Sequence, residues 1–219
     1  MSDYTLYYSP GVCSLAPHIA LEELGLAYEA ARVAVAEGAN QKPDYLAVNP
    51  RGRVPALVIR DPLGTRTLTE VSAILVYLAG LKPELKLLPA GGEPLARAVE
   101  WMSWLGSSVH AHAFAQAFRP ARFLADESQH AALQAHGRAL LGTHYADIQQ
   151  RLPAQGFALG EYSLVDAYLL VFYRWGMRIG IDMRGAYPRY TRHAETVAAR
   201  AAVQRTLQQE GIVVWEDKA

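Results

Sequence analysis

YYSPGVCSLAPHIALEELGL, the stretch from Tyr7 to Leu26, changes its hydrophobic pattern at a proline-glycine pair. Up to this pair, TLYYS has the composition of a short strand, and Pro-Gly marks a turn. After the pair, SLAPHIALEEL carries apolar residues at helical spacing. Gly25 is well suited to end that helix, because glycine readily adopts the left-handed backbone conformation. The stretch therefore predicts a strand, a turn and a helix in direct succession.

The next segments extend this α/β pattern as far as residue 81. Those with the composition of strands are YEAARVAV (28–35), VPALVI (54–59) and RTLT (66–69). The segment AEGANQKPDYLAVNP, which follows the first of them, is predicted to be a loop with at most one helical turn. Thr69 is predicted to cap a helix over EVSAILVYLAGL (70–81), which has an apolar stripe. The order β-α-β-α-β-β-α predicts one compact α/β domain.

The composition changes at KPELKLLPAGGEP, whose proline and glycine content predicts a linker. Beyond it no segment has a convincing strand pattern. The expected helices cover 95–117 and 128–152, begin at Ser163, and follow Pro188 and Ala201. Ser163-x-x-Asp166 has the pattern of a helix cap. The predicted organisation is an α/β domain over 1–81, a linker over 82–94 and an all-α helical bundle over 95–219.

Charge and cysteine content exclude several classes of protein. The 219 residues carry 21 Lys and Arg against 21 Asp and Glu, so no overall field favours nucleic acid or an anionic membrane surface. No apolar run approaches the roughly 18 residues that a membrane-spanning helix needs. Cys13 is the only cysteine, which excludes an internal disulfide. No positively charged start followed by an apolar region is found either, so a reducing, cytoplasmic setting is expected, without nucleic acid or membrane as a partner.

Cys13 lies between the Pro-Gly turn and the predicted helix. Unpaired N–H groups and the helix dipole favour negative charge there, so its thiol is expected to ionise more readily than a free thiol. The alternative is a buried filler, because free cysteine is among the most buried residue types. Residue type and position leave both interpretations open.

Two further segments have the chemistry of a peptide-binding cleft. In NPRGRVPAL, a cis Val54–Pro55 bond would turn the backbone N–H and C=O of Val54 toward an extended peptide; an ordinary edge-strand proline is the alternative. In LTEVSAIL, the residues Glu70, Val71 and Ser72 begin a helix. Backbone N–H groups there suit a carboxylate and Glu70 suits an ammonium, whereas simple capping is the alternative. Both segments lie at strand ends, as the cysteine does, so one cleft can hold all three.

Five segments together resemble the successive signature segments of bacterial glutathione transferases of the beta class. They are SPGVCSLAPHIALEELGLAYE, AVNPRGRVPAL, LTEVSAILVYLA, EWMSWLGSSVHAHAF and LGEYSLVDAYL. The match runs nearly end to end and keeps its order and spacing. The resemblance implies a thioredoxin-like N-terminal domain, an all-helical C-terminal domain and a homodimer. It also implies a cytoplasmic detoxification enzyme that uses glutathione as co-substrate.

The resemblance implies roles for individual residues of the N-terminal domain. Cys13 matches the cysteine that faces the glutathione sulfur and can form a mixed disulfide with it. Val54, before a cis Pro55, matches the residue that pairs with the cysteinyl backbone of glutathione. Glu70 and Val71 match the pair that holds the γ-glutamyl end.

The resemblance implies a contribution from the helical domain as well. His110 matches a histidine that reaches the site, and Ser103 and Ser107 fall where family members carry polar residues close to glutathione. On residue type alone, a histidine on a long helix is more often structural. His110 and His112 are two apart, the wrong spacing for one helix face, so no metal site is expected. The pocket for the electrophile is expected near Phe114, Phe118, Arg119 and Tyr173.

Several positions depart from the family pattern and bear on glutathione affinity. The position that usually supplies a lysine to the glycine carboxylate of glutathione is Glu37, or Lys42 if the loop is shifted. Val71 replaces the usual Gly or Ser, Ala111 replaces a lysine, and Arg53 stands where glutamine is common. Each missing charge-assisted hydrogen bond costs about 1.5 to 3 kcal/mol unless Arg53 or Lys42 replaces it.

The leading functional hypothesis is a glutathione S-transferase that transfers the thiol of glutathione to a small-molecule electrophile. Glutathione-dependent thiol transfer through Cys13 is a second activity of the same site. A dithiol mechanism is disfavoured because Ala16 stands where Cys-x-x-Cys needs its second cysteine. The alternative is a catalytically weak or inactive glutathione-transferase-like protein with a ligand-binding or regulatory role, which Glu37 and Val71 favour.

Overall fold

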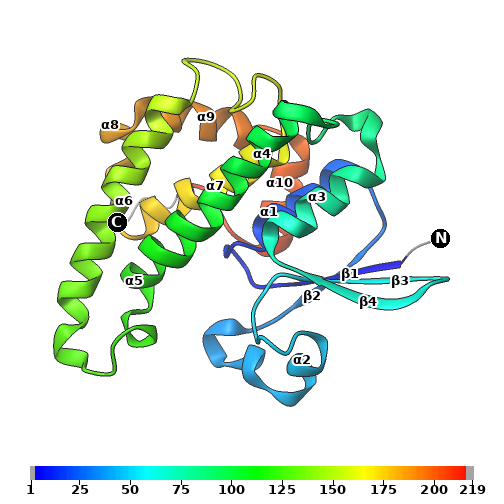
Figure 1. Ribbon diagram of the computed structural model, residues 1–219, viewed down its shortest axis with the longest axis horizontal. Coiled ribbons are helices and arrows are strands. Elements are labelled where there is room, and N and C mark those ends of the chain that lie inside the picture. Colours follow the sequence, from blue (N-terminus) through cyan, green and yellow to red (C-terminus); the bar gives the residue numbers. More distant parts are fainter. Residues whose placement is uncertain (1–2, 216–219) are drawn as a thin grey trace.

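A computed structural model describes residues 3–215 of the chain. Its N-terminal part is built on a four-stranded sheet in the order β2-β1-β3-β4 (Figure 1). The strands are β1 (Asp3–Tyr8), β2 (Glu29–Arg32), β3 (Ala56–Asp61) and β4 (Gly64–Thr69). β1 pairs in parallel with β2 and antiparallel with β3, while β3 and β4 form an antiparallel hairpin. This mixed sheet gives the predicted thioredoxin-like domain.

Helices cover the sheet on both sides. α1 (Leu15–Leu24) and α3 (Val71–Leu81) pack together on one face, and α2 (Pro43–Val48) lies on the other side (Figure 1). α1 ends as predicted, because the backbone of Gly25 has a left-handed φ of 58° and its N–H bonds back to the last turn. The sequence of this domain therefore places the first helix correctly.

Two local predictions are wrong. The segment between β2 and β3 is more helical than expected, since it contains α2 and the short 3₁₀ turns Val35–Glu37 and Ala39–Gln41. Thr69 does not cap α3, because it still pairs with Ala56 in the β3–β4 ladder. Glu70 occupies the capping position instead.

The remainder of the described chain is predominantly helical. The long elements are α4 (Gly92–Trp104), the π-helical segment η4 (Leu105–Phe114), α6 (His130–Arg151), α7 (Leu164–Arg178), α9 (Pro188–Ala198) and α10 (Ala201–Glu210). The short ones are α5 (Ala115–Phe118), α8 (Met183–Ala186) and the 3₁₀ turns Pro83–Leu85, Pro120–Arg122 and Glu127–Gln129. α4 begins at Gly92, so the helix takes in part of the segment that was expected to be a linker. None of the helices in residues 3–215 combines the length and apolar character needed to cross a bilayer.

α7 forms the centre of the helical part, and its residues from Leu164 to Gly176 are all buried. Its first turn has the predicted cap: the buried Asp166 carboxylate accepts the backbone N–H groups of Ser163 and Ala158, both at 2.8 Å. Nε2 of His193 on α9 lies 2.7 Å from the same carboxylate. These contacts offset the cost of removing the carboxylate from water.

One hydrophobic core runs through both parts of the chain. α1 packs against α7 and α10, and the connection after α3 is itself docked, since the Leu87 carbonyl accepts the Leu164 N–H at 2.9 Å. Arg200 pairs with Glu23 of α1 at 2.6 Å. The helical part is thus held in a fixed position relative to the turn before α1.

Candidate functional site

A cavity of about 880 Å³ opens between the sheet domain and the helical elements α4, η4, α5 and α7. It is bordered by the turn before α1, by the segment before β3 and by the start of α3. The residues predicted to be catalytic or to bind glutathione through the matched motifs all line this cavity: Cys13, Arg53, Val54, Pro55, Glu70, Val71, Ser72, Ser103, Ser107 and His110. The structure therefore brings together residues from both parts of the chain.

Cys13 is buried in the turn just before α1, with Sγ 3.5 Å from the carbonyl oxygen of Val54. Burial raises the pKa of the Cys13 thiol to about 12, and the nearby Glu70 adds to the rise. The expectation that this thiol ionises readily is wrong, because the loss of hydration outweighs the helix N-terminus. Cys13 is present as a thiol whose S–H points to the Val54 carbonyl.

The Val54–Pro55 peptide bond is cis, as the resemblance implied. The segment before it is held by side chains of the α2 region: Asn49 Nδ2 and Tyr45 Oη donate to the Arg53 carbonyl at 2.6 and 2.7 Å. Asn40 Nδ2 donates to the Gly52 carbonyl at 2.7 Å.

Tyr45, Asn49 and Asn40 were not among the residues predicted from the sequence to belong to the site. Their contribution depends on a segment that was predicted to have at most one helical turn and that contains α2. No described residue accepts a hydrogen bond from the backbone N–H of Val54.

Glu70 has a backbone conformation that is rare for a residue with a side chain, with φ 70° and ψ 126°. Such conformations persist where the surrounding structure enforces them, and they concentrate at functional sites. Here the Glu70 carbonyl accepts the Ile74 N–H at 3.0 Å, so the residue also begins α3. Ser72 also links α3 to α4, because its hydroxyl donates to the Met102 carbonyl of α4 at 3.3 Å.

Ser103 of α4 and Ser107 and His110 of η4 line the cavity from the continuous helix that these two elements form. Ser107 Oγ donates to the Ser103 carbonyl at 2.8 Å. The His110 ring packs against the ring of Trp175, with centroids 5.0 Å apart. Burial, together with Arg119, Arg122 and Arg53, lowers the pKa of His110 to about 4. His110 is therefore a neutral imidazole at neutral pH.

The residues that were weighed as departures from the family pattern lie partly outside the cavity. Glu37 and Lys42 are exposed and do not line it, whereas Arg53 and Arg51 do. Glu37 is thus not placed to repel a ligand carboxylate in the cavity. Tyr173 was expected near the electrophile, and this is wrong: its hydroxyl donates to Thr191 Oγ1 at 3.1 Å in the interior of the helical part.

The structure adds cavity residues that the sequence analysis missed. They include Arg51, Arg122, Phe123, Tyr168, Trp175 and Arg178. Two of them belong to FRPARF (118–123), which starts at the last residue of α5 and places two arginines between two phenylalanines. This grouping of basic and aromatic residues is the signal that could have identified them.

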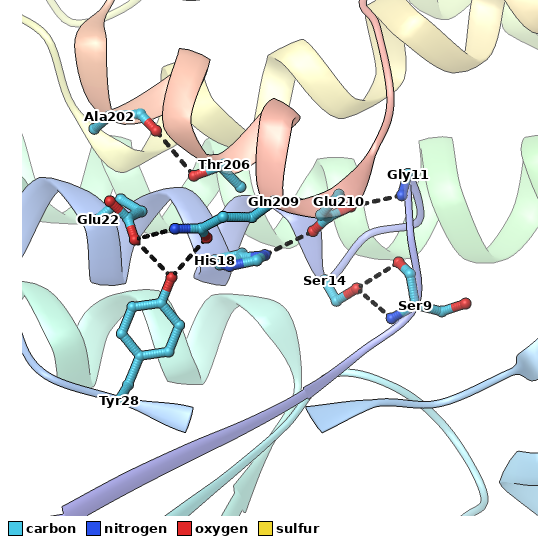
Figure 2. Close-up of polar contacts among 10 residues, drawn as sticks. All are labelled: Ser9, Gly11, Ser14, His18, Glu22, Tyr28, Ala202, Thr206, Gln209 and Glu210. Carbon is cyan, nitrogen blue, oxygen red and sulfur yellow. Dashed lines mark hydrogen bonds and ion pairs between the residues drawn. The ribbon is translucent and has the colours of Figure 1, made fainter. Parts of the chain in front are cut away.

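The turn that carries Cys13 is anchored by the last helix (Figure 2). Glu210 of α10 is buried, and its carboxylate accepts the Gly11 N–H at 2.7 Å and lies 2.9 Å from Nδ1 of His18. Trp175 Nε1 donates to the Gly11 carbonyl at 2.8 Å. Gly11 has a φ of 67°, which strains a residue that carries a side chain, and a Cβ there would also require the Arg174 guanidinium to move.

Comparison with known proteins agrees with this architecture. Residues 11–81 match the family model for the glutathione S-transferase N-terminal domain. Glutathione S-transferase GstA of Escherichia coli O157:H7 is 32% identical over 210 residues, which cover 94% of this chain and 98% of that protein. The chain therefore belongs to the glutathione S-transferase family.

Solved structures extend the comparison to the whole fold. A glutathione transferase homologue from Sulfitobacter with bound glutathione has a TM-score of 0.88 at 34% identity, covering 97% of this chain and 100% of that one. The beta-class glutathione S-transferase of Sphingomonas chungbukensis has a TM-score of 0.82 at 36% identity, covering 95% and 100%. The resemblance inferred from five sequence segments is confirmed.

Cys13 is expected to react slowly with iodoacetamide in the folded protein without glutathione. Because its pKa is raised to about 12, the thiolate is scarce at neutral pH and increases about tenfold with each pH unit up to that value. Mass spectrometry of the alkylated chain at several pH values measures this. The chain unfolded in guanidinium, with an ordinary thiol, is the control and should react about 100-fold faster or more at pH 7. Equal rates would contradict the raised pKa.

Glu210→Gln is expected to reduce the free energy of unfolding by about 2 to 4 kcal/mol, because it weakens the contacts to Gly11 and His18 at a fully buried position. Urea denaturation measures the loss. Gln208→Ala, at an exposed position of the same helix, is the control and should stay within about 0.5 kcal/mol of the unchanged protein. If both variants lose the same amount, the carboxylate is not the anchor.

Proposed function

We propose that this protein is a glutathione S-transferase that binds glutathione in the cavity of about 880 Å³ and transfers its sulfur to a small-molecule electrophile. The observation that carries the proposal is the convergence there of the Cys13 thiol, the cis Val54–Pro55 junction and the start of α3 at Glu70. The relatives that are named as glutathione S-transferases favour this enzyme over a catalytically inactive ligand-binding protein.

Glutathione is an extended peptide with charged ends, and the cavity offers groups that complement it. The backbone of Val54 pairs with the cysteinyl unit. The N–H groups at the start of α3, including that of Val71, receive the γ-glutamyl carboxylate, while the Glu70 carboxylate takes the ammonium. Arg53 takes the glycine carboxylate in place of the family lysine. Polar groups at Ser103 border the bound peptide.

Cys13 acts in this proposal as a hydrogen-bond donor, and the sulfur of glutathione is the nucleophile. The pKa of Cys13, raised to about 12, keeps it a thiol in the range where a free thiol with a pKa of roughly 8.5 begins to ionise. In this step the S–H of Cys13 turns from the Val54 carbonyl to the glutathione sulfur, and together with the N–H groups at the start of α1 it stabilises the glutathione thiolate. The thiolate attacks the electrophilic carbon, a C–S bond forms, and the leaving group departs with its electron pair.

His110 completes the site from the helical side. With its pKa lowered to about 4, the ring is neutral at physiological pH and can donate or accept one hydrogen bond at the reacting groups. Thiol transfer through a mixed disulfide at Cys13 is the second candidate activity. It requires the Cys13 thiolate, so the raised pKa makes it the slower route.

The proposal extends to a homodimer that works in the cytoplasm as a detoxification enzyme. Val76 on α3 and Val99 on α4 are 42% and 40% exposed on helices that contact one another, which supports an apolar contact with a second copy. The buried free thiol of Cys13 fits a reducing compartment. A site that joins glutathione to small electrophiles fits detoxification.

Reduced glutathione is expected to bind when it is titrated into the protein in a calorimeter, and the same protein is expected to conjugate it to 1-chloro-2,4-dinitrobenzene. Glu70→Gln removes the partner of the ammonium and should weaken binding about tenfold or more. Glu84→Gln, at an exposed position outside the cavity, is the matched control and should bind normally. Absence of binding by the unchanged protein at millimolar glutathione would contradict the proposed function.

Val99→Arg is expected to shift the protein from dimer to monomer, because it places a charge in the proposed apolar contact. Light scattering on a sizing column measures the mass of both forms. Val213→Arg is the control, since Val213 is 56% exposed and lies near the other end of the chain. A monomeric unchanged protein would exclude the dimer. A dimer that survives Val99→Arg would place the contact elsewhere on the surface.

A further inference from the structure

The cavity carries a strong excess of positive charge in a chain whose net charge is zero. Its arginines are Arg51, Arg53, Arg119, Arg122 and Arg178, whereas Glu70 is the one carboxylate among its described lining residues. Like charges that face one cavity repel each other, and an anionic ligand relieves that repulsion. The proposed glutathione site accounts for Glu70 and Arg53, which leaves Arg119 and Arg122 on the helical side without an assigned ligand group.

Arg119 and Arg122 are placed by a fixed backbone. Arg119 follows α5, where its N–H bonds to the Ala115 carbonyl at 2.9 Å. Arg122 closes the next turn, with its N–H 3.0 Å from the Arg119 carbonyl. Across residues 3–215, no carboxylate forms an ion pair with either guanidinium. Their mutual proximity also has an electrostatic effect, since partial burial together with Arg119 and Arg53 lowers the pKa of Arg122.

An aromatic wall stands beside these arginines. Phe114 and Phe118 are stacked with centroids 5.4 Å apart, and Trp175 meets Phe118 edge-on at 5.7 Å. Phe118 is 42% exposed and Phe123 is 45% exposed, although both line the cavity. Large apolar surfaces left open inside a cavity favour a flat apolar ligand. The wall and the two arginines belong to one short segment, 114–123, and to the adjoining α7.

We infer that the electrophile accepted here is an aromatic or similarly flat molecule that carries a carboxylate. Arg119 and Arg122 bind the carboxylate, with the fork geometry that guanidinium groups offer to planar anions, while Phe118 and Phe123 pack against the ring. This inference rests on the proposed function and assigns a substrate class to the same site. A neutral electrophile packs against Phe118 and Phe123 but forms no ion pair with the two arginines.

The chloride-displacement reaction of 4-chloro-3-nitrobenzoate is a suitable probe. The thiolate of glutathione attacks the carbon that bears chlorine, so that a C–S bond forms and the C–Cl bond breaks. Chloride leaves with the bonding electron pair, and the proton of the glutathione thiol passes to solvent. The reaction needs no oxidant or reductant, and the carboxylate does not take part in bond making.

The test compares this carboxylate with its methyl ester, which is neutral and similar in shape, at saturating glutathione. Arg119→Gln and Arg122→Gln are each expected to raise KM for the carboxylate about fivefold or more and to change KM for the ester less than about twofold. Higher salt should also raise KM for the carboxylate more than KM for the ester, because salt screens the charge of the two arginines. Arg97→Gln is the matched control: Arg97 is exposed on α4, outside the cavity, and its removal should alter neither KM.

Two outcomes would overturn the inference while leaving the proposed function intact. One is an equal rise of KM for both probes. The other is weaker glutathione binding in the calorimeter with no change in KM for the carboxylate at saturating glutathione, which would assign the two arginines to glutathione.

If the unchanged protein does not bind glutathione at all, the proposed function fails. Direct binding of the two probes then decides whether Arg119 and Arg122 form a site for a carboxylate. An anion site is supported if the unchanged protein binds the carboxylate more tightly than the ester and the double variant Arg119→Gln, Arg122→Gln loses this preference. Equal binding of carboxylate and ester excludes it.

Discussion

The buried carboxylate of Glu210 connects the end of the described chain to the turn on which the site is built (Figure 2). It accepts the Gly11 N–H and contacts His18 of α1, so α10, the first turn and the first helix share one buried side chain. A carboxylate without hydration needs such partners, and the partners in turn are fixed by it. Because Trp175 holds the Gly11 carbonyl, the position of Cys13 relative to the cavity depends on both parts of the chain.

The same competition between hydration and local charge sets the chemistry of the cavity. At Cys13 the helix N-terminus contributes roughly 0.3 to 1 kcal/mol, which is too little to offset full burial of the thiol. At His110, burial and three arginines act in the same direction and keep the ring neutral. The resting site therefore presents a neutral thiol and a neutral imidazole among guanidinium groups. Such a site is prepared for anions, namely the thiolate and carboxylates of its ligands.

The sequence predicted those elements whose signals are local. The Pro-Gly turn, the helix ending at Gly25 and the cap of α7 at Ser163 each depend on a few neighbouring residues, and the structure has all three. Thr69 failed as a cap because its pairing partner, Ala56, lies in another strand. α2 was predicted as no more than one helical turn, because much of its support comes from hydrogen bonds that Tyr45 and Asn49 make to the segment before the cis proline.

By itself the sequence determined the family, the order of the elements and the set of candidate site residues, because five segments kept their order and spacing over nearly the whole chain. Only the tertiary structure decided how those residues behave. The protonation of Cys13 depends on burial that no neighbouring residue reveals, and Glu37 lies outside the cavity that Arg53 lines. The grouping of Arg119 and Arg122 with Arg53 required the fold, since electrostatic energy depends on distance in space and these residues are far apart in the chain.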